Sequence, residues 1–313
     1  MVMMTNSSNL RLGTRASPLA MAQAHLTVAA LTAVHPGIAI DIVAMTATGD
    51  RILDRALAEV GGKALWTREL DAALGEGRID FAVHSLKDVE TLRPDAFTLA
   101  AMLPRADVRD KLIVRSDWTA TAIADLPHGA RVGTSSPRRA AQLRALRPDL
   151  ETPLLRGNVQ TRLGRVADGS VDATLLAAAG LDRLDMSDVG TAIDTAVLLP
   201  AASQGAIGIE CRAGDAAVHA LLAAIDDAPT RAAVMAERAL LAALGGDCRS
   251  PVAAHAATGA DGTLRLAAIL YSGDGAEMVR GDRVIDDDHA AAALARDLLA
   301  QAPASITGLF NGG

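Results

Sequence analysis

The chain has 313 residues, half of them hydrophobic and 21% charged, and its formal net charge at pH 7 is −7. A chain of this length is expected to form two or three domains, and so apolar a composition excludes extensive disorder. No apolar run reaches the roughly 18–20 residues that span a bilayer. The first ten residues also lack the basic and apolar stretches of a secretory signal. We therefore expect a cytoplasmic protein that has no membrane partner.

Short apolar runs alternate with helical patterns along the first two hundred residues. Strands are predicted over residues 10–13, 38–45 and 79–83, and helices over residues 18–35 and 67–75. Ser17, followed by Pro18, and Thr67 are the predicted N-caps of the two helices. Strands separated by helices indicate βαβ units and a mainly parallel sheet.

The same pattern then recurs along the chain. The Gly-Thr-Arg-Ala-Ser-Pro stretch at 13–18 is echoed by Gly-Thr-Ser-Ser-Pro at 133–137, and residues 77–83 are echoed by residues 169–175. These echoes predict two similar α/β domains that face one another. Strand ends and helix N-termini would line the cleft between them, and such positions favour anionic ligands.

The pattern changes near residues 212–216. A long Ala/Leu-rich helix is predicted over residues 230–244, with Glu237 and Arg238 among its few charges. Strands are predicted over residues 252–258, 263–272 and 277–284, and a last helix over residues 287–301. Three consecutive strands combined with helices predict a small α+β domain.

Positive charge is concentrated in one segment of this acidic chain. Residues 131–165 hold eight arginines and only two acidic residues, which points to a specific anionic ligand. Arg138 and Arg139 lie in the first turn of a predicted helix, Arg156 ends a strand, and Arg162 lies one turn into the next helix. Arginine binds carboxylate or phosphate through two parallel hydrogen bonds. The segment therefore predicts a site for such anions.

Nucleic acid is the competing anion for this segment. No aromatic residue lies between Trp118 and Tyr271, so the platforms on which single-stranded bases stack are missing. The net negative charge also opposes binding to a duplex. We therefore expect no nucleic-acid partner.

Lys87 and Asp88 form an adjacent pair in the polar loop that follows the third strand, residues 84–88. Such a pair is often only a solvated turn, but a second lysine, Lys63, follows two glycines in a neighbouring loop. A carboxylate beside a lysine in a cleft stays ionised, and it can stabilise a developing cation or transfer a proton.

Cys248 lies in a predicted loop, between two glycines and a proline, whereas Cys211 falls in a predicted strand and is expected in the core. There is no Cys-x-x-Cys pair, and no histidine cluster lies near either cysteine, so we expect no metal site. No Walker loop or Gly-x-Gly-x-x-Gly motif follows a strand, which argues against a nucleotide cofactor.

Nine stretches together resemble one family. They are LRLGTRASPLA (10–20), GDRILD (49–54), GGKALWTREL (61–70), FAVHSLKDV (81–89), VGTSSPRRAAQL (132–143), LRGNVQTRL (155–163), AAAGLDRL (177–184), PAASQGAIGIECR (200–212) and CRSP (248–251). In this order they resemble the hydroxymethylbilane synthases, also called porphobilinogen deaminases, from about residue 10 to residue 313.

The resemblance implies an α/β fold, with two type II periplasmic-binding-protein-like domains and a small α+β C-terminal domain. The implied ranges are 1–105 with 200–215, 106–199, and 216–313. It implies a monomeric transferase of haem and porphyrin biosynthesis, which joins four porphobilinogen molecules head to tail, releases ammonia, and hydrolyses off linear hydroxymethylbilane. The implied cofactor is dipyrromethane, bound by a thioether to the cysteine that matches Cys248.

The resemblance also assigns residues. Asp88 matches the catalytic aspartate, which would stabilise the cationic ring formed after ammonia leaves. The matches to carboxylate-binding residues are Arg15, Ser17, Lys87, Arg138, Arg139, Arg156, Arg162 and Arg183. The expected polar contacts are Ser85, Thr134, Ser135, Ser136, Asn158 and Gln204, and Lys63 belongs to a loop over the cleft.

The chain departs from the family pattern at a few positions. Residues 63–66 read Lys-Ala-Leu-Trp where Lys-Gly-Leu-Phe is usual, Glu90 replaces a proline, and Ser203 and Asp247 replace glycines. The alternative function is a non-catalytic, two-lobed protein that binds a small carboxylate or phosphate, which would have no use for Cys248 or for a third domain. A phosphoribosyl-transferring enzyme on the same lobes is a weaker alternative.

Overall fold

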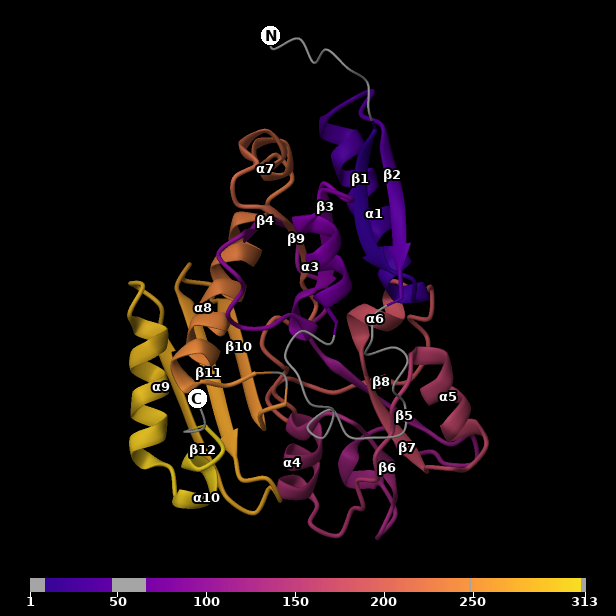
Figure 1. Ribbon diagram of the computed structural model, residues 1–313. Coiled ribbons are helices and arrows are strands. Elements are labelled where there is room, and N and C mark those ends of the chain that lie inside the picture. Colours follow the sequence, from indigo (N-terminus) through magenta and orange to yellow (C-terminus); the bar gives the residue numbers. More distant parts are fainter. Residues whose placement is uncertain (1–8, 47–65, 248, 311–313) are drawn as a thin grey trace.

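The computed structural model describes residues 9–46, 66–247 and 249–310. Within these residues the strands form three sheets of five, four and three strands. Figure 1 shows a unit around each sheet: the first at the top, the second at the lower right and the third at the left. Two α/β units and one α+β unit are present, as predicted. No helix in the described ranges is both long and apolar enough to cross a membrane.

The first unit contains a five-stranded sheet in the order β2-β1-β3-β9-β4. Its strands are β1 (Leu10–Arg15), β2 (Ile40–Met45), β3 (Phe81–Ser85), β4 (Phe97–Met102) and β9 (Ile207–Arg212). β1 pairs in parallel with β2 and β3, but β9 runs antiparallel to both β3 and β4. The sheet is therefore mainly parallel, as predicted, because β4 runs in the same direction as β1, β2 and β3. Of the five described strands β9 alone is reversed, since the chain leaves to build the second unit and returns in the opposite direction.

The helices of the first unit test two predicted caps. α1 (Pro18–Val34) begins where predicted, and the Ser17 hydroxyl accepts a hydrogen bond from the Ala20 amide at 3.3 Å. α3 (Arg68–Gly75) also begins as predicted, but the Thr67 side chain does not cap it. The Thr67 hydroxyl instead donates to the Glu90 carboxylate.

The second unit contains a four-stranded sheet in the order β6-β7-β5-β8. Its strands are β5 (Asp110–Val114), β6 (Val132–Gly133), β7 (Ala173–Ala177) and β8 (Thr191–Ala192). Its helices are α4 (Pro137–Leu146), α5 (Val159–Ala167) and α6 (Ala178–Asp182), with a 3-10 turn, η2, at Ile123–Asp125. β6 pairs in parallel with β7, and β5 is antiparallel to both of its neighbours, β7 and β8, so β5 is the reversed strand among these four.

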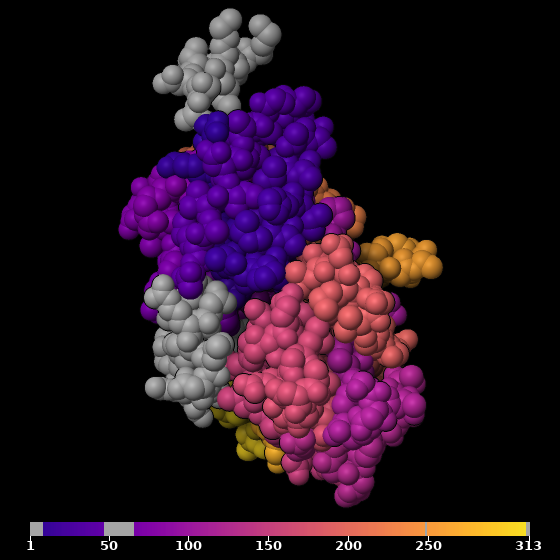
Figure 2. All heavy atoms as spheres, turned by 90° about the vertical axis from the view of Figure 1, so that its right-hand side faces the viewer, coloured from indigo at the N-terminus to yellow at the C-terminus, as the bar shows by residue number. Residues whose placement is uncertain are grey.

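The internal repeat predicted from the sequence is present in the fold. β1 leads into α1 through the Ser17 cap, and β6 leads towards α4 through Ser136, whose hydroxyl accepts from the Arg139 amide at 3.4 Å. β3 ends in the 3-10 turn η1 (Leu86–Asp88), and β7 ends in α6. In the space-filling view the first unit lies directly above the second (Figure 2).

The third unit is an antiparallel sheet with helices packed against it. It comprises α8 (Ala228–Leu244), β10 (Val252–Thr258), β11 (Leu264–Tyr271), β12 (Met278–Val284), α9 (Ala290–Gln301) and α10 (Ala304–Thr307). The three predicted strands are confirmed to within one residue. α8 begins two residues earlier than predicted, because the Asp227 side chain caps it by accepting from the Thr230 amide. α9 begins three residues later than predicted.

One helix lies on the other side of the predicted boundary. α7 (Ala216–Ala223) follows the boundary expected at residue 216. However, its Val218 and Leu222 pack in the core of the first unit with Leu12 and Phe81. A cut at residue 216 would separate α7 from the core that it helps to form. We therefore propose that the third domain begins between α7 and α8.

The third unit packs on the second through α4. Ala141 of α4 forms one buried cluster with Leu199, Ala253, Ile269 and Tyr271. The turn between β11 and β12 approaches so closely that a Cβ atom on Gly275, at φ +79°, would lie 2.4 Å from the Ala141 carbonyl oxygen. Glycine is therefore required there, and the contact places the sheet of the third unit beside the helix that carries Arg138 and Arg139.

Candidate functional site

A cleft of about 580 Å³ lies between the first two units and is closed at one side by the third. Nearly all predicted site residues in the described ranges line it. They are Arg15, Ser17, Ser85, Lys87 and Asp88 from the first unit, Ser135, Ser136, Arg138, Arg139, Arg156, Asn158, Arg162 and Arg183 from the second, and Gln204 from the segment before β9. The fold thus brings residues more than a hundred positions apart onto one surface.

One predicted site residue in the described ranges, Thr134, is not on this surface. Thr134 is only 4% exposed and lies behind the cleft wall. Its hydroxyl accepts a hydrogen bond from the Ser136 amide at 3.1 Å, so it shapes the start of α4 rather than facing the cleft. Lys63 and Cys248 lie outside the described residues.

The turn η1 presents Lys87 and Asp88 to the cleft. Leu86 anchors it, because the Leu86 side chain is fully buried and fills the space beside Gly208, where a Cβ atom would lie 2.3 Å away. The Leu86 amide also donates to the Ala206 carbonyl at 3.1 Å. With Leu86 held inward, the next two side chains are left on the cleft side.

The Lys87 ammonium is half-buried, and its surroundings oppose its charge. Burial, together with the nearby Arg139, lowers the pKa of Lys87 to about 8, although Asp88 and Asp110 act in the opposite direction. A carboxylate that binds beside Lys87 would restore its usual preference for the charged form. Binding of an anionic ligand would therefore stabilise the charged form of Lys87.

Asp110 forms buried ion pairs with the two arginines at the start of α4. Its buried carboxylate accepts from Arg138 and Arg139, both at 2.7 Å, and from the Gln204 amide at 2.9 Å. Burial alone would raise the pKa of Asp110, but the two guanidinium groups outweigh it and hold that pKa well below its usual range. Arg138 also donates to the Leu199 carbonyl at 2.7 Å, so both of its terminal nitrogens are engaged.

Arg162 and Arg183 also keep their charge in the cleft. Arg162 donates to the Gly157 carbonyl at 2.9 Å and to the Ser135 hydroxyl at 3.1 Å. Arg183 donates to the Gly205 carbonyl at 2.6 Å. Burial lowers the pKa of each to about 10, which still leaves both protonated at neutral pH.

Three cleft residues were missed by sequence reasoning. Gln23 of α1 exchanges hydrogen bonds with the Ser85 hydroxyl at 2.7 and 3.0 Å. Trp66 lies against Arg15, and Arg238 of α8 reaches the turn after Asp88. Two of them carried a sequence signal: Arg238 is one of two adjacent charges in an apolar helix, and Trp66 departs from the family pattern.

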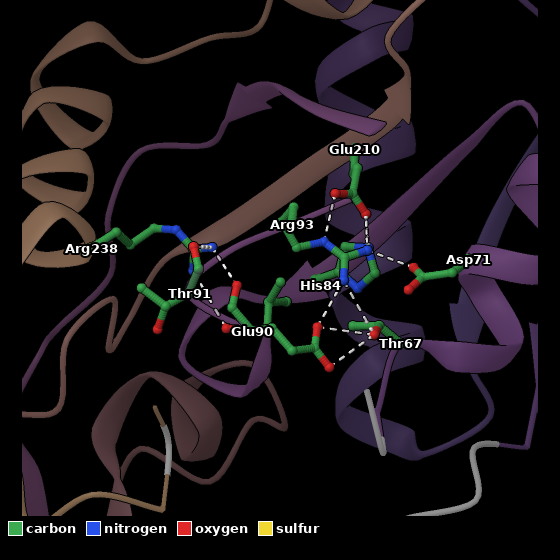
Figure 3. A network of polar contacts seen from close by, with 9 residues as sticks. Thr67, Asp71, His84, Glu90, Thr91, Arg93, Glu210 and Arg238 are labelled. Atoms are coloured by element: carbon green, nitrogen blue, oxygen red, sulfur yellow. Dashed lines mark hydrogen bonds and ion pairs between the residues drawn. The ribbon is translucent and has the colours of Figure 1, made fainter. Parts of the chain in front are cut away.

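A network of charged side chains includes residues of the segment that follows the turn η1 (Figure 3). Arg93 donates to both Glu210 oxygens at 2.8 Å, to Asp71 at 2.5 Å and to Glu90 at 2.7 Å. Burial raises the pKa of Glu210, but the nearby His84, with Nε2 3.4 Å from the carboxylate, and the hydrogen bonds from Arg93 outweigh it and lower that pKa to about 2. The network ties β9 and α3 to the segment that follows Asp88.

The lowered pKa of Glu210 predicts loss of stability in acid. Its ordinary pKa is 4.5, so its contribution is complete above pH 4.5 and is lost as the pH falls towards 2. The total lost should be about 3 kcal/mol. Between pH 5 and 2, the free energy of unfolding measured with urea should therefore fall steeply with decreasing pH in the wild type. It should fall less steeply in Glu210→Gln. Glu76→Gln, at an exposed glutamate, should behave as wild type, and an equal slope in Glu210→Gln would contradict the prediction.

The chemistry of the cleft suits a ligand with several carboxylates and at least one N–H group. The Gln204 side-chain oxygen is buried at the cleft and has no hydrogen-bond partner among the described residues. That oxygen and Asp88 are acceptors, whereas the remaining charged groups on the wall are mostly guanidinium donors. An anionic ligand that also donates hydrogen bonds would satisfy both kinds of group.

Comparisons with known proteins agree with this chemistry. The family model for the dipyrromethane cofactor binding domain of porphobilinogen deaminase matches residues 10–220, and that for its C-terminal domain matches residues 231–302. The porphobilinogen deaminase of Sphingopyxis alaskensis is 68% identical over 98% of each chain. That of Roseiflexus castenholzii is 49% identical over 93% of this chain and 96% of its own.

A solved structure is similar at lower identity. The periplasmic aliphatic sulphonate binding protein of Escherichia coli is 17% identical, with a TM-score of 0.39, over 67% of this chain and 63% of its own.

Proposed function

This chain belongs to the porphobilinogen deaminase family, and from its cleft we propose how its residues carry out the family's reaction. It is a transferase that joins four porphobilinogen molecules head to tail with release of ammonia, and then hydrolyses the product to linear hydroxymethylbilane. The observation that carries the assignment of roles is the surrounding of Asp88 by cations from both α/β units. The non-catalytic alternative is not favoured, since relatives over nearly the whole chain are deaminases.

The cations are proposed to hold the side-chain carboxylates of the substrate and of the growing chain. Each porphobilinogen ring carries an acetate and a propionate, so four rings bring eight negative charges into the cleft. Arg15 and Lys87 would bind them from the first unit, and Arg156, Arg162 and Arg183 from the second. Guanidinium groups suit this task because they stay charged and bind carboxylates through paired hydrogen bonds.

We propose that Arg138 and Arg139 have different roles. Arg138 gives its terminal nitrogens to Asp110 and Leu199, so it mainly holds Asp110 in place. Arg139 gives one terminal nitrogen to Asp110. Its guanidinium is thereby oriented at the cleft wall, where the other nitrogens can bind a substrate carboxylate.

The cofactor of this family is dipyrromethane, and the cleft residues fit it. Its carboxylates would meet the arginines, and its pyrrole N–H groups would meet Asp88 and the unpartnered Gln204 oxygen. When bound, it supplies the pyrrole carbon to which the first substrate is joined. Beside the proposed attachment residue Cys248, the negative charge of Asp247 is balanced by Arg249, which donates to it at 2.9 and 2.6 Å.

Asp88 is proposed as the catalytic residue. Positive charge develops on a substrate ring as ammonia leaves and again as the new carbon–carbon bond forms. A carboxylate hydrogen-bonded to the pyrrole N–H would stabilise that charge, and it could accept the proton that must be lost. The turn η1 holds Asp88 at the cleft without using its carboxylate for a cap, since Leu86 provides the anchor.

We also propose that the protein acts as a cytoplasmic monomer without nucleic-acid or membrane partners. One chain supplies groups on every side of the cleft, so the site does not require a second copy. The arginines that could bind polyanions face the cleft or pair with acids, as Arg131 does with Asp172 and Arg147 with Asp149.

Intact mass tests the attachment and the function together. Protein incubated with porphobilinogen should be heavier than its sequence by two linked pyrrole units, and Cys248→Ser should lack this increment. Cys211→Ser is the matched control, because Cys211 is fully buried and burial raises the pKa of its thiol to about 11. A wild-type mass equal to that of the bare chain, with no colour from Ehrlich's reagent, would contradict the proposal.

A further inference from the structure

The ring of Trp66 lies against the guanidinium of Arg15. The Arg15 Cζ atom is 4.3 Å from the ring centroid, and both side chains line the cleft. They come from different elements, since Arg15 ends β1 and Trp66 lies two residues before α3. Tryptophan is the aromatic side chain that attracts a cation most strongly. The contact therefore restricts the Arg15 side chain.

This contact changes what it costs Arg15 to bind a ligand. A guanidinium group binds a carboxylate through its N–H groups, and a long arginine side chain loses rotamer freedom when it does so. The ring of Trp66 already removes part of that freedom, so less remains to be lost when a carboxylate binds.

The backbone next to Trp66 is itself fixed. Thr67 is fully buried, and its hydroxyl donates to the Glu90 carboxylate at 3.0 and 3.1 Å instead of capping α3. Arg93 donates to the same carboxylate at 2.7 Å. Arg93 is in turn held by Glu210 and Asp71, as Figure 3 shows. Glu90 thus joins the segment after Asp88 to the segment that carries Trp66.

We propose that Trp66 is a positioning residue that holds Arg15 ready for a substrate carboxylate, and that Glu90 holds Trp66 in place through Thr67. The inference rests on the proposed role of Arg15 in carboxylate binding. It gives a function to two positions, Trp66 and Glu90, at which this chain departs from the family pattern. It also connects the turn that bears Asp88 to the binding of substrate.

Fluorescence tests the contact independently of activity. The chain has two tryptophans, Trp66 and Trp118, so Trp118→Phe leaves Trp66 as the single reporter. In that background, Arg15→Met should shift the Trp66 emission and increase its quenching by acrylamide, because one face of the ring loses its cover. Thr67→Val should cause a change in the same direction, whereas Thr67→Ser should restore the parent values.

Kinetics test the role. Trp66→Leu should raise the KM for porphobilinogen by about 3- to 30-fold with little change in kcat, because the loss lies in binding. Trp66→Phe, which keeps a weaker ring, should raise KM by a smaller factor. Trp118→Leu is the matched control: it removes a looser contact with Arg115, at 5.9 Å and outside the cleft, and should leave KM unchanged.

The outcomes separate this inference from the proposed function. If the Trp118→Phe parent consumes porphobilinogen but Trp66→Leu keeps its KM, Trp66 does not position Arg15. If Arg15→Met leaves the emission of Trp66 unchanged, the two side chains are not in contact. A parent that carries no cofactor mass and consumes no porphobilinogen would instead overturn the proposed function, whatever the emission shows. If Trp66→Leu fails to fold, Trp66→Phe and Thr67→Val decide the question.

Discussion

Asp88→Asn should retain the cofactor and lose turnover by about two to four orders of magnitude. The amide has the size and shape of the carboxylate, but it carries no charge to stabilise a cationic ring and cannot accept its proton. The pKa of the neighbouring Lys87 is kept from falling further by Asp88, so carboxylate binding would also change in the variant. Single-turnover release of ammonia, measured on protein whose intact mass shows the cofactor, isolates the chemical step.

The control for Asp88→Asn is the same substitution on the surface. Asp117 is exposed and pairs with Arg115 on the surface, so Asp117→Asn should keep full activity. Full activity in Asp88→Asn would remove Asp88 from the proposed catalytic role. A variant that never gains the cofactor mass would instead place Asp88 in cofactor assembly, which also contradicts the prediction.

Glu237→Ala should lower the free energy of unfolding by about 3–5 kcal/mol. Glu237 is fully buried in α8 and accepts from both terminal nitrogens of Arg105, at 2.8 and 3.0 Å. It also accepts from the amides of Ser203 and Ala256, at 2.6 and 2.8 Å. Its removal would leave a largely buried guanidinium and two backbone N–H groups without their acceptor, where the first and third units meet.

Urea unfolding followed by circular dichroism measures the effect of Glu237→Ala. The surface variant Glu76→Ala should unfold as wild type does, since Glu76 is exposed. A double variant, Arg105→Met with Glu237→Leu, should recover part of the loss because it leaves no unpaired buried charge. A Glu237→Ala protein as stable as wild type would show that the junction between the units is held by its apolar contacts alone.

Local signals along the chain were enough to predict most individual elements. The Ser-Pro pairs at 17–18 and 136–137 predict helix starts because a serine hydroxyl can cap the exposed amides of the first turn. The three strands of the third unit were predicted from the Gly-Asp turns between them, and β10 and β11 are mainly apolar. The arginine-rich segment 131–165 likewise indicated an anionic ligand, since charge and residue type are properties of the sequence.

Other features depend on contacts between residues that are far apart in the chain. The direction of β9 and the placement of α7 follow from the return of the chain to the first unit after residue 200. Thr67 has the right position for a cap, but its hydroxyl donates to the carboxylate of Glu90, 23 residues later. Thr134 belongs to a family motif, yet its neighbours bury it behind the cleft.

An acidic chain with a basic segment was visible from composition and position alone. The fold gives the arginines of that segment different environments. Arg138 and Arg139 donate to the buried Asp110, whereas Arg162 donates to a carbonyl and a hydroxyl. Charge is carried by the residue itself, and so it can be read from the sequence. The use of that charge depends on which partner lies within hydrogen-bond distance, and only the packing of distant segments determines that partner.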